Sequence, residues 1–317
     1  MARILTDAEI KSMVNIGDMM DAVEEMHRRY AVGEAFNADR RTVELGDGHL
    51  AIMGGGLAYE GLYGAKTYTT VAGTQQYHVT LYDAATGRLK SFIHANWLGA
   101  LRTGATTGVA VRHLANADAD VLGMIGTGYQ AQTQVMAVAQ ARPLKQVKVY
   151  SRRTAPRVEF ADRLSQVLDV EVLPVQDARD AVQGSSIVVC LTTTKEPVMD
   201  GVWLEEGALL VSAGPVTLDA QEVDAVSLQR AGLIVTDSLE QARYEAGELV
   251  AGVEAGIIRW DDVVQLSHVV AGLTRGRRER SENIYVKHFG IGVVDIAAAK
   301  LAFDLALAKG VGLEIDI

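Results

Sequence analysis

A glycine-rich turn between two buried strands constrains the fold of this chain more than any other segment. An apolar strand at 121–125 precedes the turn, and an amphipathic helix to about residue 141 and a second strand at 147–151 follow it. The turn residues, which we expect to contact a cofactor, are Gly126, Thr127, Gly128, Tyr129 and Gln130. Glycine permits the tight turn and lets backbone N–H groups approach a pyrophosphate at the helix N-terminus. The segment therefore predicts a dinucleotide-binding β-α-β unit, with an ordinary strand-turn-helix as the alternative.

The end of the second strand bears on which dinucleotide binds. NAD-binding folds usually place Asp or Glu there, where it accepts hydrogen bonds from the ribose hydroxyls. This chain has Ser151, Arg152 and Arg153 instead, and no carboxylate until Glu159. A hydroxyl and two guanidinium groups favour a 2′-phosphate through charge-assisted hydrogen bonds. We therefore expect NADPH, with NADH as the second choice. The alternative is that both arginines are solvated charges at a strand end.

Composition and charge disfavour several classes of protein. The 317 residues, 49% of them hydrophobic, are enough for a substantial core and predict two domains. The net charge of −10 argues against partners such as nucleic acid or an anionic membrane. Neither a long apolar run nor a signal-peptide pattern is present, so we expect a cytoplasmic protein. A single cysteine, Cys190, provides no disulfide framework, and we expect no metal because no Cys/His cluster has ligand spacing.

Strand and helix signals indicate a nucleotide-binding domain inserted in a second domain. Two N-terminal helices, the first opened by a Thr6–Glu9 capping box, precede strands between 40 and 94 and a long helix at about 95–114. An alanine-rich helix at 297–309 is expected to return to the first domain. The Rossmann-like strands are expected at 121–125, 147–151, 170–173, 186–191, 208–212 and 232–236. The predicted fold class is α/β, with a Rossmann NAD(P)-binding domain at 114–288 and a discontinuous α+β substrate-binding and dimerisation domain at 1–113 and 289–317.

Three cationic residues outside the nucleotide unit are candidates for chemistry. Lys66 lies among small, β-prone residues, where a half-buried ammonium can donate a proton; an edge-strand lysine that discourages aggregation is the alternative. Arg102 lies on a small, apolar helix face and needs a partner if it is buried. Arg41 could complete a carboxylate clamp, although a pair of surface arginines is an equally ordinary interpretation. His78 and His94 are alternative proton donors, but histidines in alternating strands are more often packed or exposed.

Several motifs occur in order along nearly the whole chain. They include GAKTY at 64–68, LRTGA at 101–105, IGTGYQA at 125–131, YSRR at 150–153 and VDIA at 294–297. Together they resemble the ornithine cyclodeaminase/μ-crystallin family. That family includes cyclodeaminases, alanine dehydrogenases, ketimine and cyclic-imine reductases, and a thyroid-hormone-binding crystallin.

This resemblance implies a homodimer of two-domain subunits that acts on a small imino or amino acid. Lys66 would be the catalytic lysine and would bind the substrate together with Arg41 and Arg102. The residues that would face the cofactor are Arg102, Thr103 and, from their place after a Rossmann strand, Thr192 and Thr193. For the last two, a simple Thr-rich turn is the alternative.

One departure from the family bears on the reaction. Its cyclodeaminases carry an aspartate after the fifth Rossmann strand that handles the substrate amine, whereas this chain has Val216 there and its nearest acid, Asp219, three residues later. Ornithine cyclisation is therefore disfavoured. We predict an NAD(P)H-dependent reductase of imines of α-keto acids, or an amino-acid dehydrogenase in reverse. The alternatives are an NAD-dependent lyase that converts L-ornithine to L-proline and ammonia, and a non-catalytic, μ-crystallin-like binder of small ligands.

Overall fold

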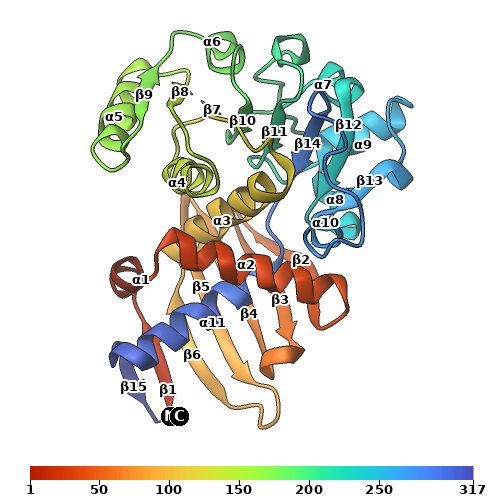
Figure 1. Ribbon diagram of the computed structural model, residues 1–317. Helices are drawn as coiled ribbons and strands as arrows, with labels where there is room; N and C mark the ends of the chain where they lie inside the picture. Colours follow the sequence, from red (N-terminus) through yellow and green to blue (C-terminus); the bar gives the residue numbers. More distant parts are fainter. Residues whose placement is uncertain (317) are drawn as a thin grey trace. The chain divides into compact units, whose positions relative to one another are not determined.

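The computed structural model describes residues 1–316, which divide into two compact units. Unit 1 comprises residues 1–105 and 290–316, and unit 2 comprises Thr106–Phe289. Each unit has a sheet of its own (Figure 1). The predicted α/β class, with a Rossmann domain inserted in a discontinuous second domain, is confirmed. The first division lies inside helix α3 (Asn96–Leu114), whereas the sequence placed it near the end of that helix.

Unit 1 is built on a seven-stranded mixed sheet with the order β15-β1-β6-β5-β4-β3-β2. Its strands are β1 (Ala2–Leu5), β2 (Ala35–Leu45), β3 (Gly48–Leu57), β4 (Leu62–Val71), β5 (Thr74–Asp83), β6 (Leu89–His94) and β15 (Leu313–Ile315). Strands β2 to β6 form an antiparallel meander, and β1 pairs parallel to β6. Strands β1 and β15 were not predicted, because runs of four and three residues are too short to show a period.

Three helices that lie wholly within unit 1 are on one face of this sheet. They are α1 (Asp7–Met13), α2 (Ile16–Ala31) and α11 (Gly292–Lys309). Helix α11 packs on β2 to β5 and on α2 (Figure 1). The approach is close because a Cβ at Gly55 would lie 2.6 Å from the Cα of Val293, and one at Gly64 would lie 2.9 Å from Ile296 Cδ1. Glycines in β3 and β4 thus allow the first turns of α11 to lie directly on the sheet.

Unit 2 is built on an eight-stranded parallel sheet with the order β13-β12-β14-β11-β10-β7-β8-β9. Its strands are β7 (Val121–Ile125), β8 (Gln146–Tyr150), β9 (Glu171–Pro174), β10 (Ile187–Cys190), β11 (Leu209–Ser212), β12 (Ala231–Thr236), β13 (Val263–Gln265) and β14 (Asn283–Lys287). The six Rossmann-like strands of the prediction correspond to β7 to β12. Strands β13 and β14 were not predicted; β14 lies between β11 and β12, and the chain then re-enters unit 1.

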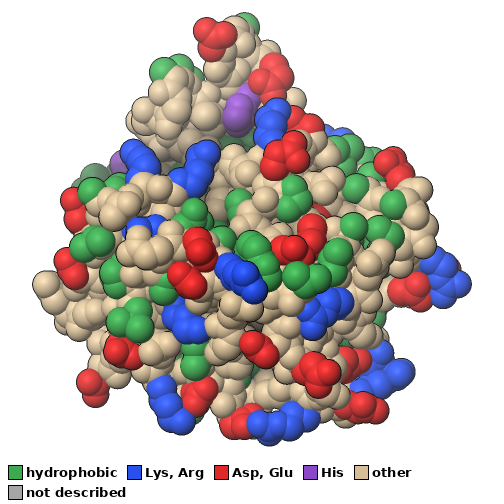
Figure 2. Space-filling model, turned by 90° about the horizontal axis from the view of Figure 1, so that it is seen from above, with side chains coloured by type: hydrophobic (Ala, Val, Ile, Leu, Met, Phe, Trp, Pro, Cys, Tyr) green, Lys and Arg blue, Asp and Glu red, His purple; other side chains and the backbone are tan. Residues whose placement is uncertain are grey.

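The helices of unit 2 connect these strands. They are α4 (Ala131–Ala141), α5 (Thr154–Ser165), α6 (Ala178–Val182), α7 (Ala225–Arg230), α8 (Leu239–Glu245), α9 (Gly247–Glu254) and α10 (Leu266–Val270). Within residues 1–316, no helix is both long and apolar enough to cross a membrane. Acidic and basic side chains are interspersed on the face shown in Figure 2. That face therefore lacks the large basic patch typical of nucleic-acid binding.

Candidate functional site

The glycine turn lies at the carboxyl end of β7, where open parallel sheets bind ligands. Gly126 has a φ of +112°, and a Cβ there would lie 2.1 Å from the carbonyl oxygen of Leu191. Gly128 faces open space, since a Cβ there would meet no atom within 4 Å. Tyr129 is 63% exposed, and Gln130 immediately precedes α4. The turn thus has the backbone geometry that a pyrophosphate at a helix N-terminus requires.

The loop after β8 is joined to this turn by a hydroxyl pair. Thr127 Oγ1 donates to Ser151 Oγ at 3.0 Å, and Ser151 Oγ lies 3.3 Å from the carbonyl oxygen of Arg153. Arg152 and Arg153 are both exposed. Arg157, which the sequence did not single out, is buried and donates to the carbonyl oxygen of Ser151 at 3.1 Å. This loop therefore presents two unburied guanidinium groups on a backbone that a third arginine fixes.

Unit 1 contains a buried cluster of two cations and one carboxylate. Lys66 on β4, Arg102 on α3 and Asp295 in the first turn of α11 are 3%, 5% and 2% exposed. Asp295 Oδ1 lies 3.2 Å from Lys66 Nζ and 2.9 Å from Arg102 Nε. Because β4 lies between β3 and β5, Lys66 is not an edge-strand lysine. Asp295 was not predicted as a site residue, although an acid in the apolar run at 293–299 was the available signal.

Burial sets the protonation of Lys66. Desolvation, with the positive charge of Arg102, lowers the pKa of Lys66 to about 7, and Asp295 partly offsets this. The ammonium also lies 5.1 Å from the ring centroid of Tyr77 and 5.7 Å from that of Tyr68. Burial raises the pKa of Tyr77 to about 12, so its phenol stays protonated. Near neutral pH Lys66 therefore exists in both protonation states, as a group that gives and takes a proton must.

The third cation of this cluster is Arg40 rather than Arg41. Arg41 is exposed on β2. Arg40 is partly buried, its Nη2 lies 3.4 Å from the carbonyl oxygen of Gly290, and its charge contributes to the lowered pKa of Lys66. The pairing of β2 with β3 shifts register between Ala38 and Arg41. This irregularity, which alternation along the sequence does not reveal, exchanges the two arginines between faces.

The two histidines considered as proton donors lie away from Lys66. His78 pairs with Thr67 on one side and with His94 on the other, and the two imidazole rings are 5.3 Å apart. Successive side chains of a strand point to opposite faces, so the row that contains Thr67 points away from Lys66. Within unit 1, Lys66 is therefore the better candidate for proton transfer.

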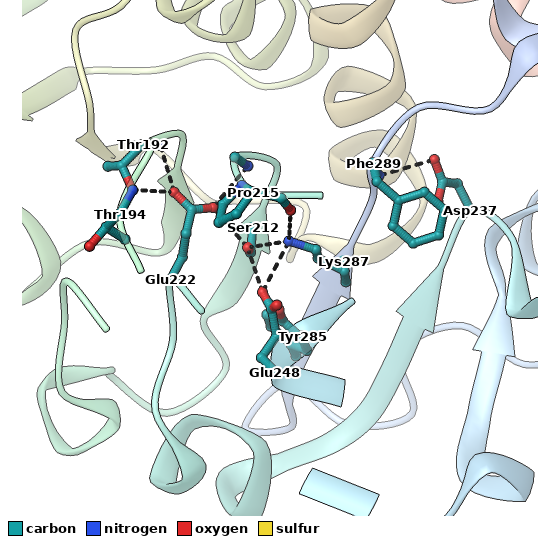
Figure 3. Close-up of polar contacts among 11 residues, drawn as sticks. Thr192, Thr194, Ser212, Pro215, Glu222, Asp237, Glu248, Tyr285, Lys287 and Phe289 are labelled. Atoms are coloured by element: carbon teal, nitrogen blue, oxygen red, sulfur yellow. Dashed lines mark hydrogen bonds and ion pairs between the residues drawn. The ribbon is translucent and has the colours of Figure 1, made fainter. Parts of the chain in front are cut away.

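The predicted threonines have different surroundings. Thr103 is buried, and its hydroxyl donates to the carbonyl oxygen of Gly99 at 2.7 Å within α3. Thr193 is exposed. Thr192 is part of a network at the carboxyl ends of β10 and β11 (Figure 3), in which its N–H and hydroxyl both donate to Glu222. The sequence analysis singled out Thr192 as a residue expected to face the cofactor, but it did not identify Glu222, the buried acceptor of its hydrogen bonds.

The region of the cyclodeaminase aspartate carries no buried acid between 215 and 219. Val216 is half-buried, and Asp219 is exposed and forms an ion pair with Lys195. The hydrogen bond from Lys195 lowers the pKa of Asp219, which therefore stays ionised. An exposed, paired carboxylate is a poor replacement for an acid that handles a substrate amine.

A parallel sheet with a glycine turn at its carboxyl edge, joined in sequence to a unit with a buried lysine, defines a Rossmann-type dinucleotide-binding protein. The chain belongs to the ornithine cyclodeaminase/mu-crystallin family, which it matches over residues 2–310.

Three solved structures are similar to the chain over nearly its full length. The Delta(1)-pyrroline-2-carboxylate reductase of Thermococcus litoralis, in complex with NADH and L-proline, is 29% identical, with a TM-score of 0.95 and coverage of 99% of this chain and 100% of that one. An archaeal alanine dehydrogenase dimer with bound NAD is 32% identical, with a TM-score of 0.93 and 99% of each chain covered. The iminosuccinate reductase of Paracoccus denitrificans, in complex with NAD+, is 27% identical, with a TM-score of 0.92 and coverage of 100% and 99%.

Proposed function

We propose that this protein is an NADPH-dependent reductase of imines derived from α-keto acids, and an amino-acid dehydrogenase in the reverse direction. The observation that carries the proposal is the buried Lys66, whose pKa of about 7 and contact with the Asp295–Arg102 pair suit proton transfer to nitrogen. The names of the similar proteins support the same chemistry, because pyrroline-2-carboxylate and iminosuccinate both carry a C=N bond next to a carboxylate.

Each charged group of the cluster has a role in this proposal. Arg102 and the predicted Arg41, or Arg40 in its place, bind the substrate carboxylate and so orient the C=N bond. The bound reduced nicotinamide supplies the hydride to the imine carbon. Protonated Lys66 gives its proton to the imine nitrogen, and neutral Lys66 takes a proton from the amine in the reverse reaction. Asp295 keeps Lys66 and Arg102 in place.

The preference for NADPH rests on the loop after β8. Ser151, Arg152 and Arg153 offer a hydroxyl and two exposed guanidinium groups to a 2′-phosphate, and no carboxylate is present there to accept ribose hydroxyls. The similar structures contain NADH or NAD, so this preference would distinguish the chain from those relatives.

The sheet face of unit 1 opposite Lys66 carries exposed aromatic side chains. On the sheet face away from Lys66, Phe36, Gly56, Tyr63 and Tyr82 share one register row, and Phe36 and Tyr63 are 56% and 43% exposed. Large exposed aromatic side chains in one row favour a protein partner. We propose that a second copy of the chain covers this face, as a dimer is described for the archaeal alanine dehydrogenase.

A substrate screen tests the proposed function. Cyclic imino acids, and keto acids supplied with ammonia or methylamine, would be incubated with the protein while NADPH and NADH absorbance are followed separately. We expect turnover with at least one imino acid and a higher kcat/KM with NADPH. Equal or better rates with NADH would overturn the NADPH preference. Formation of proline and ammonia from ornithine, without net cofactor consumption, would establish a cyclodeaminase instead.

A binding control separates an enzyme from a ligand carrier. If no imine oxidises either cofactor, and Lys66→Ala leaves the affinity for a bound carboxylate ligand unchanged, the protein is a non-catalytic binder. Loss of turnover in Lys66→Ala with retained cofactor binding supports the reductase.

A further inference from the structure

The buried carboxylate of Glu222 joins the ends of two central strands in unit 2 (Figure 3). It accepts hydrogen bonds from the N–H and Oγ1 of Thr192 at 2.5 and 2.7 Å, beyond the end of β10. It also accepts from Ser212 Oγ at 2.8 Å and from the N–H of Gly214 at 2.9 Å, at the end of β11. We propose that Glu222 is a positioning residue for the nicotinamide half of the cofactor and acts through Thr192.

Several hydrogen-bond donors converge on this carboxylate. Glu222 is fully buried, and three groups donate to its two oxygens: the N–H and hydroxyl of Thr192 and the N–H of Gly214. Ser212 Oγ also contacts it, but its single proton is shared between Glu222 and Glu248. Hydrogen bonds to a carboxylate are stronger than those between neutral groups. The nearby ammonium of Lys287 is paired with Glu248 at 3.1 Å. Glu222 is therefore held by neutral donors from the strand ends.

Glycine at 214 is required for this arrangement. A Cβ there would lie 2.3 Å from the carbonyl oxygen of Thr192 and 2.5 Å from Glu222 Oε1. Any side chain at this position would displace the carboxylate from Thr192. The missing side chain at 214 thus allows both the close approach of the two strand ends and the position of the carboxylate between them.

The same residues adjoin the glycine turn. A Cβ at Gly126 would lie 2.1 Å from the carbonyl oxygen of Leu191 and 3.5 Å from Thr192 Cγ2. The turn that fits a pyrophosphate is therefore in contact with the segment that Glu222 holds. The loop after β8, where we expect the adenosine 2′-phosphate, and the end of β10 lie on opposite sides of β7. Thr192 is therefore on the side expected for the nicotinamide half.

The hydrogen bond to Glu222 also fixes the chemistry of Thr192. A hydroxyl has one proton to donate, and Thr192 Oγ1 donates it to Glu222. Toward a ligand, this oxygen can then act only as an acceptor. Ribose hydroxyls and the carboxamide NH2 are donors, so the fixed Thr192 is complementary to the nicotinamide half and not to a phosphate.

A second set of buried residues is connected to Glu222 through Ser212. Ser212 Oγ contacts both Glu222 and Glu248, at 2.8 and 2.9 Å. Glu248 also accepts from the hydroxyl of Tyr285 at 2.9 Å, and Lys287 donates to the carbonyl oxygen of Pro215 at 2.9 Å. The position of Glu222 is thereby coupled to β14, which makes a freely rotating carboxylate impossible.

A double-mutant cycle tests this inference, which rests on the proposed dinucleotide function. Affinities of Glu222→Gln, Thr192→Val and the double variant would be measured for NADPH and for 2′,5′-ADP, which carries only the adenosine half. We expect each single variant to weaken NADPH binding about tenfold or more and to leave 2′,5′-ADP binding unchanged. The double variant should be no worse than the weaker-binding single variant, because Glu222 acts through Thr192.

Two further variants keep the test decisive. Asp224→Asn is the matched control, because Asp224 also accepts several backbone and hydroxyl donors but none from the ends of β10 or β11. It should leave both affinities unchanged. If Glu222→Gln does not fold, Glu222→Asp, which withdraws the carboxylate from Thr192, should give the same selective loss.

The inference fails if the effects of Glu222→Gln and Thr192→Val are additive, or if 2′,5′-ADP binding weakens as much as NADPH binding. Failure of the proposed function looks different. In that case the unaltered protein reduces no imine, or binds neither NADPH nor NADH.

Discussion

Asp295→Asn gives the sharpest test of the Lys66 chemistry. The carboxylate Oδ1 lies 3.2 Å from Lys66 Nζ, and both side chains are almost fully buried. At an effective dielectric constant near 20, two unit charges at this distance attract by about 5 kcal/mol. An asparagine is neutral but still polar, so we expect the variant to lose at least a third of this attraction. One pKa unit corresponds to about 1.4 kcal/mol, and the pKa of Lys66 should therefore fall by about one unit or more. Desolvation and the charges of Arg102 and Arg40, which lower this pKa, remain in the variant.

The assay is the pH dependence of kcat/KM in both directions. Imine reduction requires protonated Lys66, so in the unaltered enzyme the rate should fall as pH rises through about 7. Amine oxidation requires neutral Lys66, so its rate should rise through the same pH. In Asp295→Asn both limbs should move to lower pH, because the ammonium has lost its anionic partner. Titration of the substrate itself is common to both enzymes and cancels in the comparison.

Asp304→Asn is the matched control for this experiment. Asp304 lies on the same helix, α11, and its ion pair is with Lys300 at 2.8 Å. This variant should leave both pH limbs unchanged. If the limbs of Asp295→Asn coincide with those of the unaltered enzyme, Lys66 is not the group that titrates, and the assignment of proton transfer to it is refuted.

Four other variants probe the remaining parts of the proposal. Arg102→Ala should lower kcat/KM about 100-fold or more, because a buried carboxylate loses its charged partner, and an unchanged value would remove Arg102 from the site. Replacing Arg152 and Arg153 together by alanine should raise KM for NADPH about tenfold without changing KM for NADH; equal effects on both would show that neither arginine contacts the 2′-phosphate. Tyr63→Asp should convert the proposed dimer to a monomer in size-exclusion chromatography with light scattering, and a retained dimer would move the interface elsewhere. Lys66→Met should abolish turnover without lowering the Tm, because burial already penalises this ammonium, and a large loss of stability would assign it a structural role instead.

Two other titratable groups of unit 1 can be compared with Lys66. His78 lies on the other sheet face, where burial and the charge of His94 lower its pKa. The phenol of Tyr77, with its pKa raised to about 12, stays neutral in the working range. Of these three side chains, Lys66 is the one that contacts Asp295 and has a pKa of about 7.

The sequence alone determined the features that depend on neighbours along the chain. The turn at Gly126 follows from residue order, since only glycine has both the positive φ and the room for the Leu191 carbonyl. The capping box at Thr6 and Glu9 was equally predictable, because its two partners are three residues apart. Lys66 and Arg102 were found because a charge in an otherwise small or apolar segment is costly without a partner.

Only the tertiary structure decided which groups those charges meet. Asp295 reaches Lys66 and Arg102 because glycines in the sheet let α11 pack against it, and no local pattern encodes a contact between segments so far apart. A register shift in β2, and not the alternation of residue types, placed Arg40 instead of Arg41 beside the cluster. Local order along a chain fixes backbone conformation, whereas the partners of buried charges are fixed by long-range packing, which brings distant segments into a volume without water to solvate them.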